Sequence, residues 1–380
     1  MALTPRHQTS DAWTSAAIDS LGASLDAAIH DAGVPGGVLA VGQVALPADP
    51  VSRPPSDRPP SDRLPTDRLP TDRLPTGRPP TRAVSGRGIL GPECGAAVPD
   101  GHTRYDMASL TKVVATWPLI GRAVRDGLLD PDEPLRTYLP DAPAPGRDLT
   151  TRHLMTHTSG MLPSTGLARY QLSGRSLLDH LCAEPLVDVP GARHRYIDRG
   201  FILLGLLLPI IRNRPLHELA AEFWQELGLD STCYGPLARS ARVAPTEARL
   251  AGAPRTWGIP HDPSAALLGG VAGHAGVFST AADLATFAEH LLTPANPLAD
   301  WFESSRQPAI AVEPGLLRGL AWIVTADGTA AYHHGYTGTS LYLSPPTGRY
   351  IVLCTNAVYH GWQRTRLAPV RDLALRTLTS

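Results

Sequence analysis

The order of the apolar patterns along the chain limits the fold more than any other feature of the sequence. An amphipathic helical pattern over residues 12–32 is followed by a buried-strand pattern over residues 38–44. Further strand patterns lie near the C-terminus, before a closing helical pattern, and the chain between the two ends is mainly helical. Because strands from both ends must pair to bury their apolar faces, we predict one sheet built from the N- and C-terminal segments, with a helical insert.

The composition is typical of a globular protein and argues against several functional classes. Of the 380 residues, 43% are hydrophobic and 18% are charged, and the formal net charge is −1. A nearly neutral chain has little attraction for nucleic acid or for a membrane surface, so we expect neither as a partner. The four cysteines show no metal or disulfide spacing, and the N-terminus has no signal-peptide pattern. We therefore expect a cytoplasmic protein without a cofactor, and the oligomeric state stays open.

Residues 47–82 differ in kind from the rest of the chain. Arginine recurs there every five residues, from Arg53 to Arg78, in units rich in proline, serine, threonine and aspartate. A period of five matches neither helix nor strand, and the apolar content is too low for a folded core. We predict a disordered, proline-rich pentapeptide repeat inserted in a hairpin loop between two strands. The repeat is either a neutral expansion or a segment that binds partners.

The segment Ser109-Leu110-Thr111-Lys112 contains the only lysine of the chain, beside 33 arginines. A surface cation tolerates replacement by arginine, whereas a group that must lose its proton near neutral pH does not. Helix-forming sequence runs from residue 110 to about residue 126, so Ser109 lies at the helix start and Lys112 lies one turn later on the same face. We therefore interpret Lys112 as a candidate catalytic amine that acts on the hydroxyl of Ser109.

Two further segments carry residue types that are suited to catalysis or binding. Tyr196 and Asp198 precede an apolar helical run over residues 201–211, where Asp198 could equally be an ordinary N-cap. His153 and His157 have the helical spacing of a metal-binding pair, but no acidic residue or third histidine follows at ligand distance. We expect these two histidines to pack and to cap, and we predict no metal site.

Taken together, these segments resemble the serine β-lactamase and penicillin-binding-protein superfamily, in its class C-like branch of esterases and D-Ala-D-Ala carboxypeptidases. Ser109-Leu110-Thr111-Lys112 is similar to the S-x-x-K motif, and Tyr196-Ile197-Asp198 is similar to Y-x-N with aspartate in place of asparagine. His333-His334-Gly335 is similar to the K-T-G element in an H-x-G form. The resemblance implies an α+β fold with an antiparallel sheet flanked by helices and an all-helical lobe inserted.

The resemblance also implies where the lobes and the active site lie. Residues 1–108 and 280–380 would form the α/β lobe, residues 109–279 would form the mainly helical lobe, and the active site would occupy the cleft between them. Ser109 would attack an ester or amide carbonyl and form an acyl-enzyme, with Lys112 helping to remove the serine proton.

Several other residues would complete the active site. Tyr196 would pass a proton to the leaving group. The backbone N–H groups of Ser109 and Tyr336 would hold the oxyanion, beside Gly335. His333 would take the position of the superfamily's second lysine and donate a hydrogen bond to the substrate or to the tyrosine oxygen.

Two departures from the superfamily pattern bear on the substrate. His333 replaces a lysine, and the charge of a histidine depends on pH near neutrality. Asp198 adds a negative group and removes an amide donor. Both changes weaken the recognition of an anionic substrate, so we predict an esterase, amidase or acyl-transferase that acts on a small ester or amide. The alternatives are a D-alanyl-D-alanine carboxypeptidase or weak β-lactamase and, without catalysis, a ligand-binding sensor or scaffold on the same fold.

Overall fold

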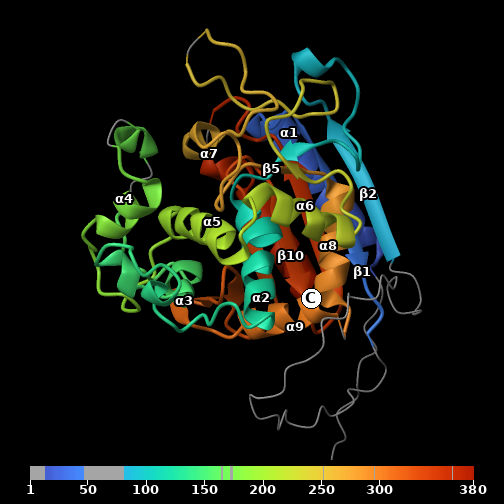
Figure 1. Ribbon diagram of the computed structural model, residues 1–380. Helices are drawn as coiled ribbons and strands as arrows, with labels where there is room; N and C mark the ends of the chain where they lie inside the picture. Colours follow the sequence, from blue (N-terminus) through green and yellow to red (C-terminus); the bar gives the residue numbers. More distant parts are fainter. Residues whose placement is uncertain are drawn as a thin grey trace, which may run out of the picture.

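The central element of the structure is an antiparallel sheet that draws its strands from both ends of the chain (Figure 1). The computed structural model describes residues 13–46, 81–163, 166–171, 174–250, 252–294, 296–361 and 363–380. Within these residues the sheet has eight strands, in the order β2-β1-β11-β10-β9-β8-β7-β6. The strands are β1 (Gly36–Gln43), β2 (Thr81–Gly88), β6 (Ile310–Glu313), β7 (Leu316–Arg318), β8 (Ile323–Thr325), β9 (Ala331–His334), β10 (Ser340–Ser344) and β11 (Arg349–Thr355). The predicted α+β class, with one sheet built from both termini, is confirmed.

Both faces of the sheet are covered, which explains why β1 reads as a continuous apolar run. Successive side chains of a strand point to opposite faces. Val38 accordingly lies in the core that includes α8, whereas Leu39 lies in a second core with residues of the two terminal helices. In Figure 1, α2, α6 and α8 lie in front of β10. The helices that cover the two faces are α2 (Trp117–Arg125) and α8 (Ala281–Leu292) on one side, and α1 (Ser15–Ala32) and α10 (Ala368–Thr379) on the other.

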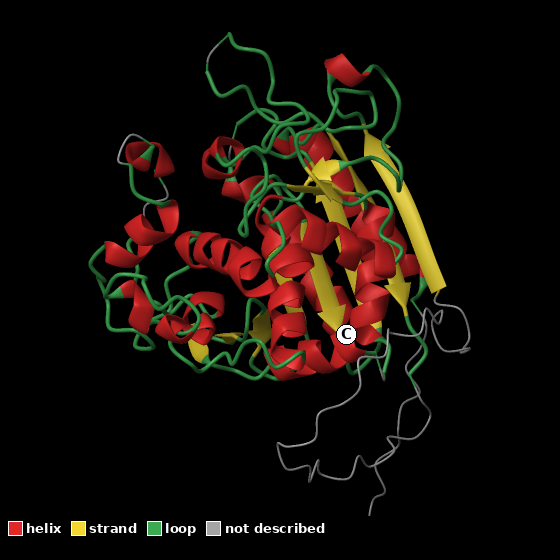
Figure 2. Cartoon of the chain, viewed as in Figure 1, coloured by secondary structure: helices red, strands yellow, loops and turns green. Residues whose placement is uncertain are grey.

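The middle of the chain forms the predicted helical insert (Figure 2). The longest helix of the insert is α5 (Arg199–Arg212). It is buried along most of its length because its sequence is apolar on all sides from Phe201 to Leu208. A small sheet of β3 (Tyr105–Asp106), β5 (Val277–Ser279) and β4 (Cys233–Tyr234) holds the start and the end of the insert together. The other α-helices of the insert are α3 (Thr151–Met155), α4 (Leu177–Ala183), α6 (Leu216–Glu226) and α7 (Pro263–Leu267). Helix α9 (Pro297–Ser305) comes after the insert in the chain. None of the described helices is long and apolar enough to cross a membrane.

The predicted repeat over residues 47–82 lies almost entirely outside the described residues. Its last two residues do not belong to it, because Thr81 and Arg82 form the start of β2. Arg82 is held in that position by Glu289 of α8, with Nη2 and Oε2 at 2.8 Å. Strands β1 and β2 pair antiparallel, from Gly36 opposite Gly88 to Gln43 opposite Thr81. The assignment of the two lobes to residues 1–108 with 280–380 and to residues 109–279 stays a prediction.

Candidate active site

Ser109 and Lys112 lie together at the start of α2, where the helix is irregular. Ser109 belongs to a single 3₁₀ turn, Ala108–Leu110, and a π-helical turn, Lys112–Thr116, follows before the regular α-helix begins. The predicted helix over residues 110–126 is therefore correct in place but not in its first turns. Helical bulges of this kind often lie at functional sites. Nζ of Lys112 donates a hydrogen bond to Oγ of Ser109 at 2.7 Å, which is the pairing expected from their spacing.

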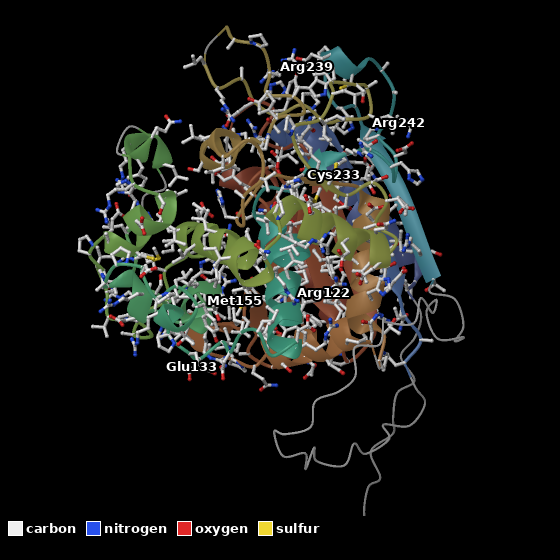
Figure 3. The ribbon with its side chains drawn as sticks, viewed as in Figure 1. Arg122, Glu133, Met155, Cys233, Arg239 and Arg242 are labelled. Carbon is white, nitrogen blue, oxygen red and sulfur yellow. The ribbon has the colours of Figure 1, made fainter. Side chains whose placement is uncertain are left out.

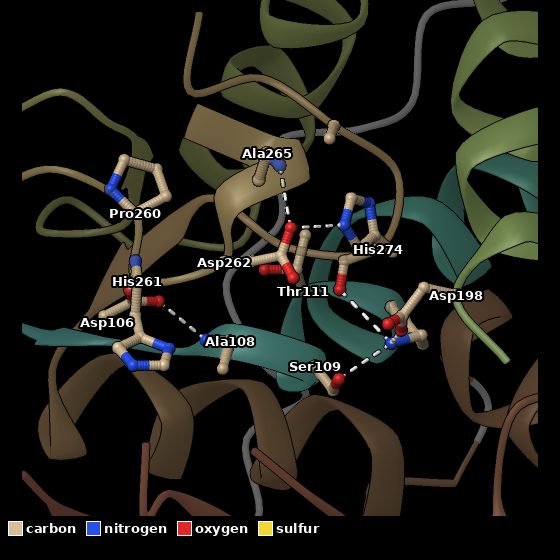
Figure 4. Close-up of polar contacts among 12 residues, drawn as sticks. Asp106, Ala108, Ser109, Thr111, Asp198, Pro260, His261, Asp262, Ala265 and His274 are labelled. Atoms are coloured by element: carbon tan, nitrogen blue, oxygen red, sulfur yellow. Dashed lines mark hydrogen bonds and ion pairs between the residues drawn. The ribbon is translucent and has the colours of Figure 1, made fainter. Parts of the chain in front are cut away.

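The environment of Lys112 separates it from the other basic residues of the chain. Its side chain is fully buried. By contrast, arginines such as Arg239 and Arg242 are exposed on the surface (Figure 3). Besides Ser109, Lys112 contacts Oδ1 of Asp198 at 2.7 Å and the carbonyl oxygen of His274 at 3.4 Å (Figure 4). All three donors of the ammonium group are thus used inside the protein.

These contacts determine the charge of Lys112. Burial alone would lower the pKa of Lys112, but the negative charge of Asp198, together with Tyr196, outweighs burial, and the pKa is raised. Lys112 is therefore an ammonium ion in the resting site. In that form it can orient the serine hydroxyl, but it has no lone pair with which to accept the serine proton.

Asp198 occupies the N-cap position of α5, but its side chain does not cap the helix. It directly precedes α5, yet its side chain accepts no hydrogen bond from the first turn of that helix. Instead its carboxylate turns toward Lys112 and forms an ion pair with it. A buried cation is strongly destabilising without a negative partner, which explains why the carboxylate binds Lys112. The structure places Asp198 in contact with the candidate catalytic amine.

Asp106, which the sequence did not mark, fixes the backbone just before Ser109. Its buried carboxylate accepts hydrogen bonds from the N–H of Ala108 at 2.8 Å and from the N–H of His261 at 2.6 Å (Figure 4). Ala108 has a φ of 44°, a conformation that residues other than glycine adopt rarely. The hydroxyl of Thr337 donates to the carbonyl of Asp106 at 2.6 Å. Asp106 therefore links the turn before Ser109 to the turn after β9.

The turn after β9 contains the residues expected to complete an oxyanion site. A Cβ atom at Gly335 would collide with the carbonyl oxygen of Met107, so glycine is required for the strand to approach the nucleophile segment this closely. The ring of Tyr336 is half exposed and stacks on the imidazole of His261, with centroids 5.3 Å apart. The structure thus brings Gly335 and Tyr336 to the predicted side of Ser109. Their role in binding an oxyanion stays a prediction.

Tyr196 lies among aromatic and cationic groups. Its ring is 43% exposed, and the ring centroid is 5.0 Å from Nζ of Lys112. The imidazole of His157 packs against the tyrosine ring at 4.4 Å between centroids, and its Nδ1 accepts from the N–H of Ile197 at 3.3 Å. His153 instead caps α3, where its Nδ1 accepts from the N–H of Thr150. The two histidines therefore pack and cap as expected.

His333 is neutral, which corrects the expectation that its charge changes near neutral pH. The side chain is buried, and burial lowers the pKa of His333 well below its usual value, with further lowering by Lys112 and Arg318. Neither ring nitrogen of His333 has a hydrogen-bond partner within the described residues. Its ring lies 6.2 Å from that of Tyr196, so the predicted hydrogen bond between the two side chains is not formed.

Arg318, at the end of β7, is a second buried cation beside Tyr196. Its side chain is 2% exposed, and its guanidinium carbon lies 5.8 Å from the centroid of the tyrosine ring. Nε donates to His194 at 3.3 Å and Nη1 donates to the carbonyl of Ala321 at 3.0 Å. Among the described residues no carboxylate forms an ion pair with it. Burial lowers the pKa of Arg318 to about 10, so it stays charged at neutral pH.

An antiparallel sheet with a helical insert, and a serine hydroxyl held by a buried lysine at the start of a helix, together define the β-lactamase-like class of hydrolase folds. Comparison with known proteins agrees with this class. Residues 92–376 match the model of the Beta-lactamase family, and the chain therefore belongs to that family.

The relatives with similar sequences are hydrolases. A putative D-alanyl-D-alanine carboxypeptidase of Escherichia coli (strain K12) is 28% identical over 301 residues, which cover 67% of this chain and 69% of the relative. An N-acetylmuramyl-L-alanine amidase of Bacillus subtilis is 29% identical over 300 residues, covering 67% of this chain and 68% of the relative. EstCE1, a hydrolase with promiscuous acyltransferase activity, has a similar structure with a TM-score of 0.68 at 19% identity, covering 94% of this chain and 98% of that one. At that identity the structural likeness shows the fold alone.

Proposed function

We propose that the protein is a serine hydrolase that forms an acyl-enzyme on Ser109 with an ester or amide substrate. One observation carries the proposal: the single lysine of the chain is fully buried and donates a hydrogen bond of 2.7 Å to Oγ of Ser109. A buried lysine needs a strong reason to be kept, since removing its charge from water is costly. Orientation of a serine nucleophile for attack supplies such a reason.

The reaction follows from the positions of these groups. Oγ of Ser109 attacks the substrate carbonyl carbon, and the oxyanion that develops is held by the backbone N–H groups of Ser109 and Tyr336. When the tetrahedral intermediate collapses, the phenol of Tyr196 gives a proton to the leaving group. Water or another nucleophile then attacks the acyl-enzyme by the same steps in reverse order. The hydrolases among the relatives and the acyltransferase activity named for EstCE1 support a choice of acceptor at this stage.

A second candidate function is that of a D-alanyl-D-alanine carboxypeptidase, and Arg318 favours it. A buried guanidinium without a carboxylate partner attracts an anionic group of a ligand. A substrate that ends in a carboxylate beside the scissile bond would supply that group. The loss of the superfamily's second lysine to His333 therefore weakens the case for an anionic substrate less than the sequence suggested. The similar putative carboxypeptidases agree with this candidate.

The test of the acyl-enzyme uses a fluorophosphonate probe and a chromogenic short-chain ester. We expect the probe to label Ser109, as located by peptide mass spectrometry, and Ser109→Ala to lose both labelling and ester turnover. Ser304→Ala is the matched control, because Ser304 is exposed on α9 and donates only to the carbonyl of Asp300. Full ester turnover by folded Ser109→Ala would refute the proposal. Faster turnover of D-Ala-D-Ala peptides than of simple esters would favour the second candidate.

A further inference from the structure

We propose that Asp198 is the final acceptor of the Ser109 proton, with Lys112 as the relay between them. The inference rests on the proposed acyl-enzyme function and names the base that this function requires. It gives a chemical role to the aspartate that replaces the asparagine of the Y-x-N pattern. The three groups form one continuous hydrogen-bonded line from Oγ through Nζ to Oδ1, with 2.7 Å for each step (Figure 4).

Among the contacts of Lys112, the carboxylate of Asp198 and the phenol of Tyr196 are the groups that can act as bases. Its ammonium group donates to the hydroxyl of Ser109, to the carbonyl of His274 and to the carboxylate of Asp198. A hydroxyl and a peptide carbonyl are far too weak to take a proton from an ammonium group, whereas a carboxylate can take one in a concerted transfer. The side chain of Asp198 makes no helix-cap bond, so its Oδ1 is dedicated to Lys112.

The proton transfers balance without any further reactant. As Oγ of Ser109 bonds to the carbonyl carbon, Oδ1 of Asp198 takes a proton from Nζ of Lys112, and the lone pair that this leaves on Nζ accepts the proton of Oγ. Lysine ends the step as an ammonium ion, aspartate becomes neutral, and the carbonyl electron pair moves to the oxygen. When the carbonyl re-forms, the leaving group departs with the phenol proton of Tyr196. The proton on Asp198 then returns through Lys112 to the phenolate, which restores the resting site.

Tyr196 is the other residue that could serve as the first base, since its side chain also forms a hydrogen bond with Lys112. The proposed function uses its phenol proton for the leaving group, which leaves Asp198, with Oδ1 2.7 Å from Nζ, as the acceptor of the serine proton. The other titratable groups that act on Lys112 are farther from it, and they are Asp262, His157 and His333. Because the pKa of Lys112 is raised in spite of its burial, a neutral lysine is scarce at pH 7. In the relay Asp198 takes a proton from Lys112 within the same step, so the reaction does not depend on lysine that is neutral in the resting site.

The test compares Asp198→Asn with the wild type over a range of pH. The amide can hold Nζ in place but cannot take a proton, so Lys112 in the variant must first lose its own. We expect the ratio of wild-type to variant kcat/KM on an aryl ester to be about a hundredfold at pH 7. We also expect the ratio to fall about tenfold for each unit of rising pH, as neutral lysine accumulates. Asp283→Asn is the matched control, because Asp283 is a buried carboxylate that binds Ser231 and Thr232 away from the site.

A second measurement determines how many protons are transferred in the rate-limiting step of acylation. In mixtures of light and heavy water, a relay of two protons gives a curved dependence of the acylation rate on deuterium content, and a single transfer gives a straight line. We expect a curve for the wild type and a line for Asp198→Asn. Asp198→Glu keeps a carboxylate, so we expect it to retain the wild-type pH profile. It also provides a second test of the relay if Asp198→Asn does not fold.

The possible outcomes separate this inference from the proposed function. If a fluorophosphonate does not label Ser109 in the wild type, the acyl-enzyme itself is refuted. If Ser109 is labelled but the ratio is independent of pH, Asp198 only positions Lys112 and the relay is wrong. If Asp198→Asn is faster than the wild type at pH 7, the aspartate restrains the lysine, and the relay is again wrong.

Discussion

Two buried cations, Lys112 and Arg318, lie near the ring of Tyr196, and they differ in the partners that the protein gives them. Lys112 has all three donors occupied, by a hydroxyl, a carbonyl and a carboxylate. Arg318 is equally buried, but its partners within the described residues are one imidazole and one carbonyl. The neighbour of Arg318, His333, has no partner for either ring nitrogen. We call Lys112 with its partners the lysine side, and Arg318 with His333 the arginine side. The lysine side has all its hydrogen bonds made within the protein, whereas polar groups of the arginine side lack partners.

This difference separates the two tasks of the site. Buried polar groups without partners destabilise a protein, so a ligand that supplies the missing hydrogen bonds would be bound more tightly. The complete side holds the nucleophile in a fixed geometry before substrate arrives, as electrostatic preorganisation requires. The incomplete side offers one positive charge and two ring nitrogens of a neutral imidazole. We infer that chemistry is fixed on the lysine side and that substrate choice is made on the arginine side.

The largest expected effect comes from breaking the lysine side while its charge is kept. Lys112→Arg retains a cation beside Asp198, but a guanidinium cannot exchange protons at neutral pH and is too broad for the site. We expect kcat/KM for an aryl ester to fall about 10³-fold, with the fold retained by circular dichroism. The reverse change at the surface, Arg239→Lys, is the matched control and should leave kcat/KM unchanged. Activity near the wild-type level in Lys112→Arg would show that charge alone suffices.

The contrast between the two cations also shows what the sequence could reveal. Lys112 was evident because it is the only lysine, and its spacing from Ser109 matched a known motif. Arg318 is one of 33 arginines, and nothing in its local sequence distinguishes it from those on the surface. Its burial depends on the pairing of β7 with β8, which brings it beside segments more than 100 residues away in the chain, such as that of His194. A contact between segments so far apart in the chain cannot be predicted from the local sequence.

The same limit applies to charge states and to the fold. The apolar strand patterns at both ends of the chain were enough to predict one sheet from both termini, because such patterns are a local property of the sequence. The neutral state of His333, the ammonium state of Lys112 and the side-chain partner of Asp198 all depend on neighbours brought in by folding. The π-helical turn after Ser109 was missed for a similar reason, since helix propensity does not distinguish a bulge from a regular turn.

A smaller and selective effect is expected when the arginine side is broken. Arg318→Gln removes the charge but keeps a hydrogen-bond donor of similar size. We expect kcat/KM to fall roughly 10- to 100-fold for substrates with a carboxylate beside the scissile bond, because a hydrogen bond to a charged group contributes about 1.5–3 kcal/mol. Neutral esters with the same scissile bond should change little, and Arg318→Lys should recover part of the loss. Equal losses on both kinds of substrate would mean that Arg318 supports Tyr196 and does not choose the substrate.

The smallest expected effect concerns stability and tests whether His333 is neutral. In the unfolded chain a histidine binds a proton below about pH 6.5, whereas folded His333, with its pKa well below that value, does not. Between these two pKa values the unfolded state binds more protons, so the free energy of unfolding falls as the pH is lowered. His157 and His194 have lowered pKa values as well and add to this fall.

Removing one of these histidines should therefore make the protein less sensitive to acid. We expect the free energy of unfolding of His333→Gln, from urea denaturation between about pH 6.5 and pH 5, to fall less steeply than that of the wild type, by up to about 1.4 kcal/mol per pH unit. Above pH 6.5 the two curves should run parallel, because neither the folded nor the unfolded state then binds the proton. Parallel curves at all pH values would instead mean that folded His333 titrates like a free histidine. The arginine side would then carry two positive charges below pH 6.5 and would attract a carboxylate more strongly in acid, which the same Arg318→Gln comparison at pH 5.5 would reveal.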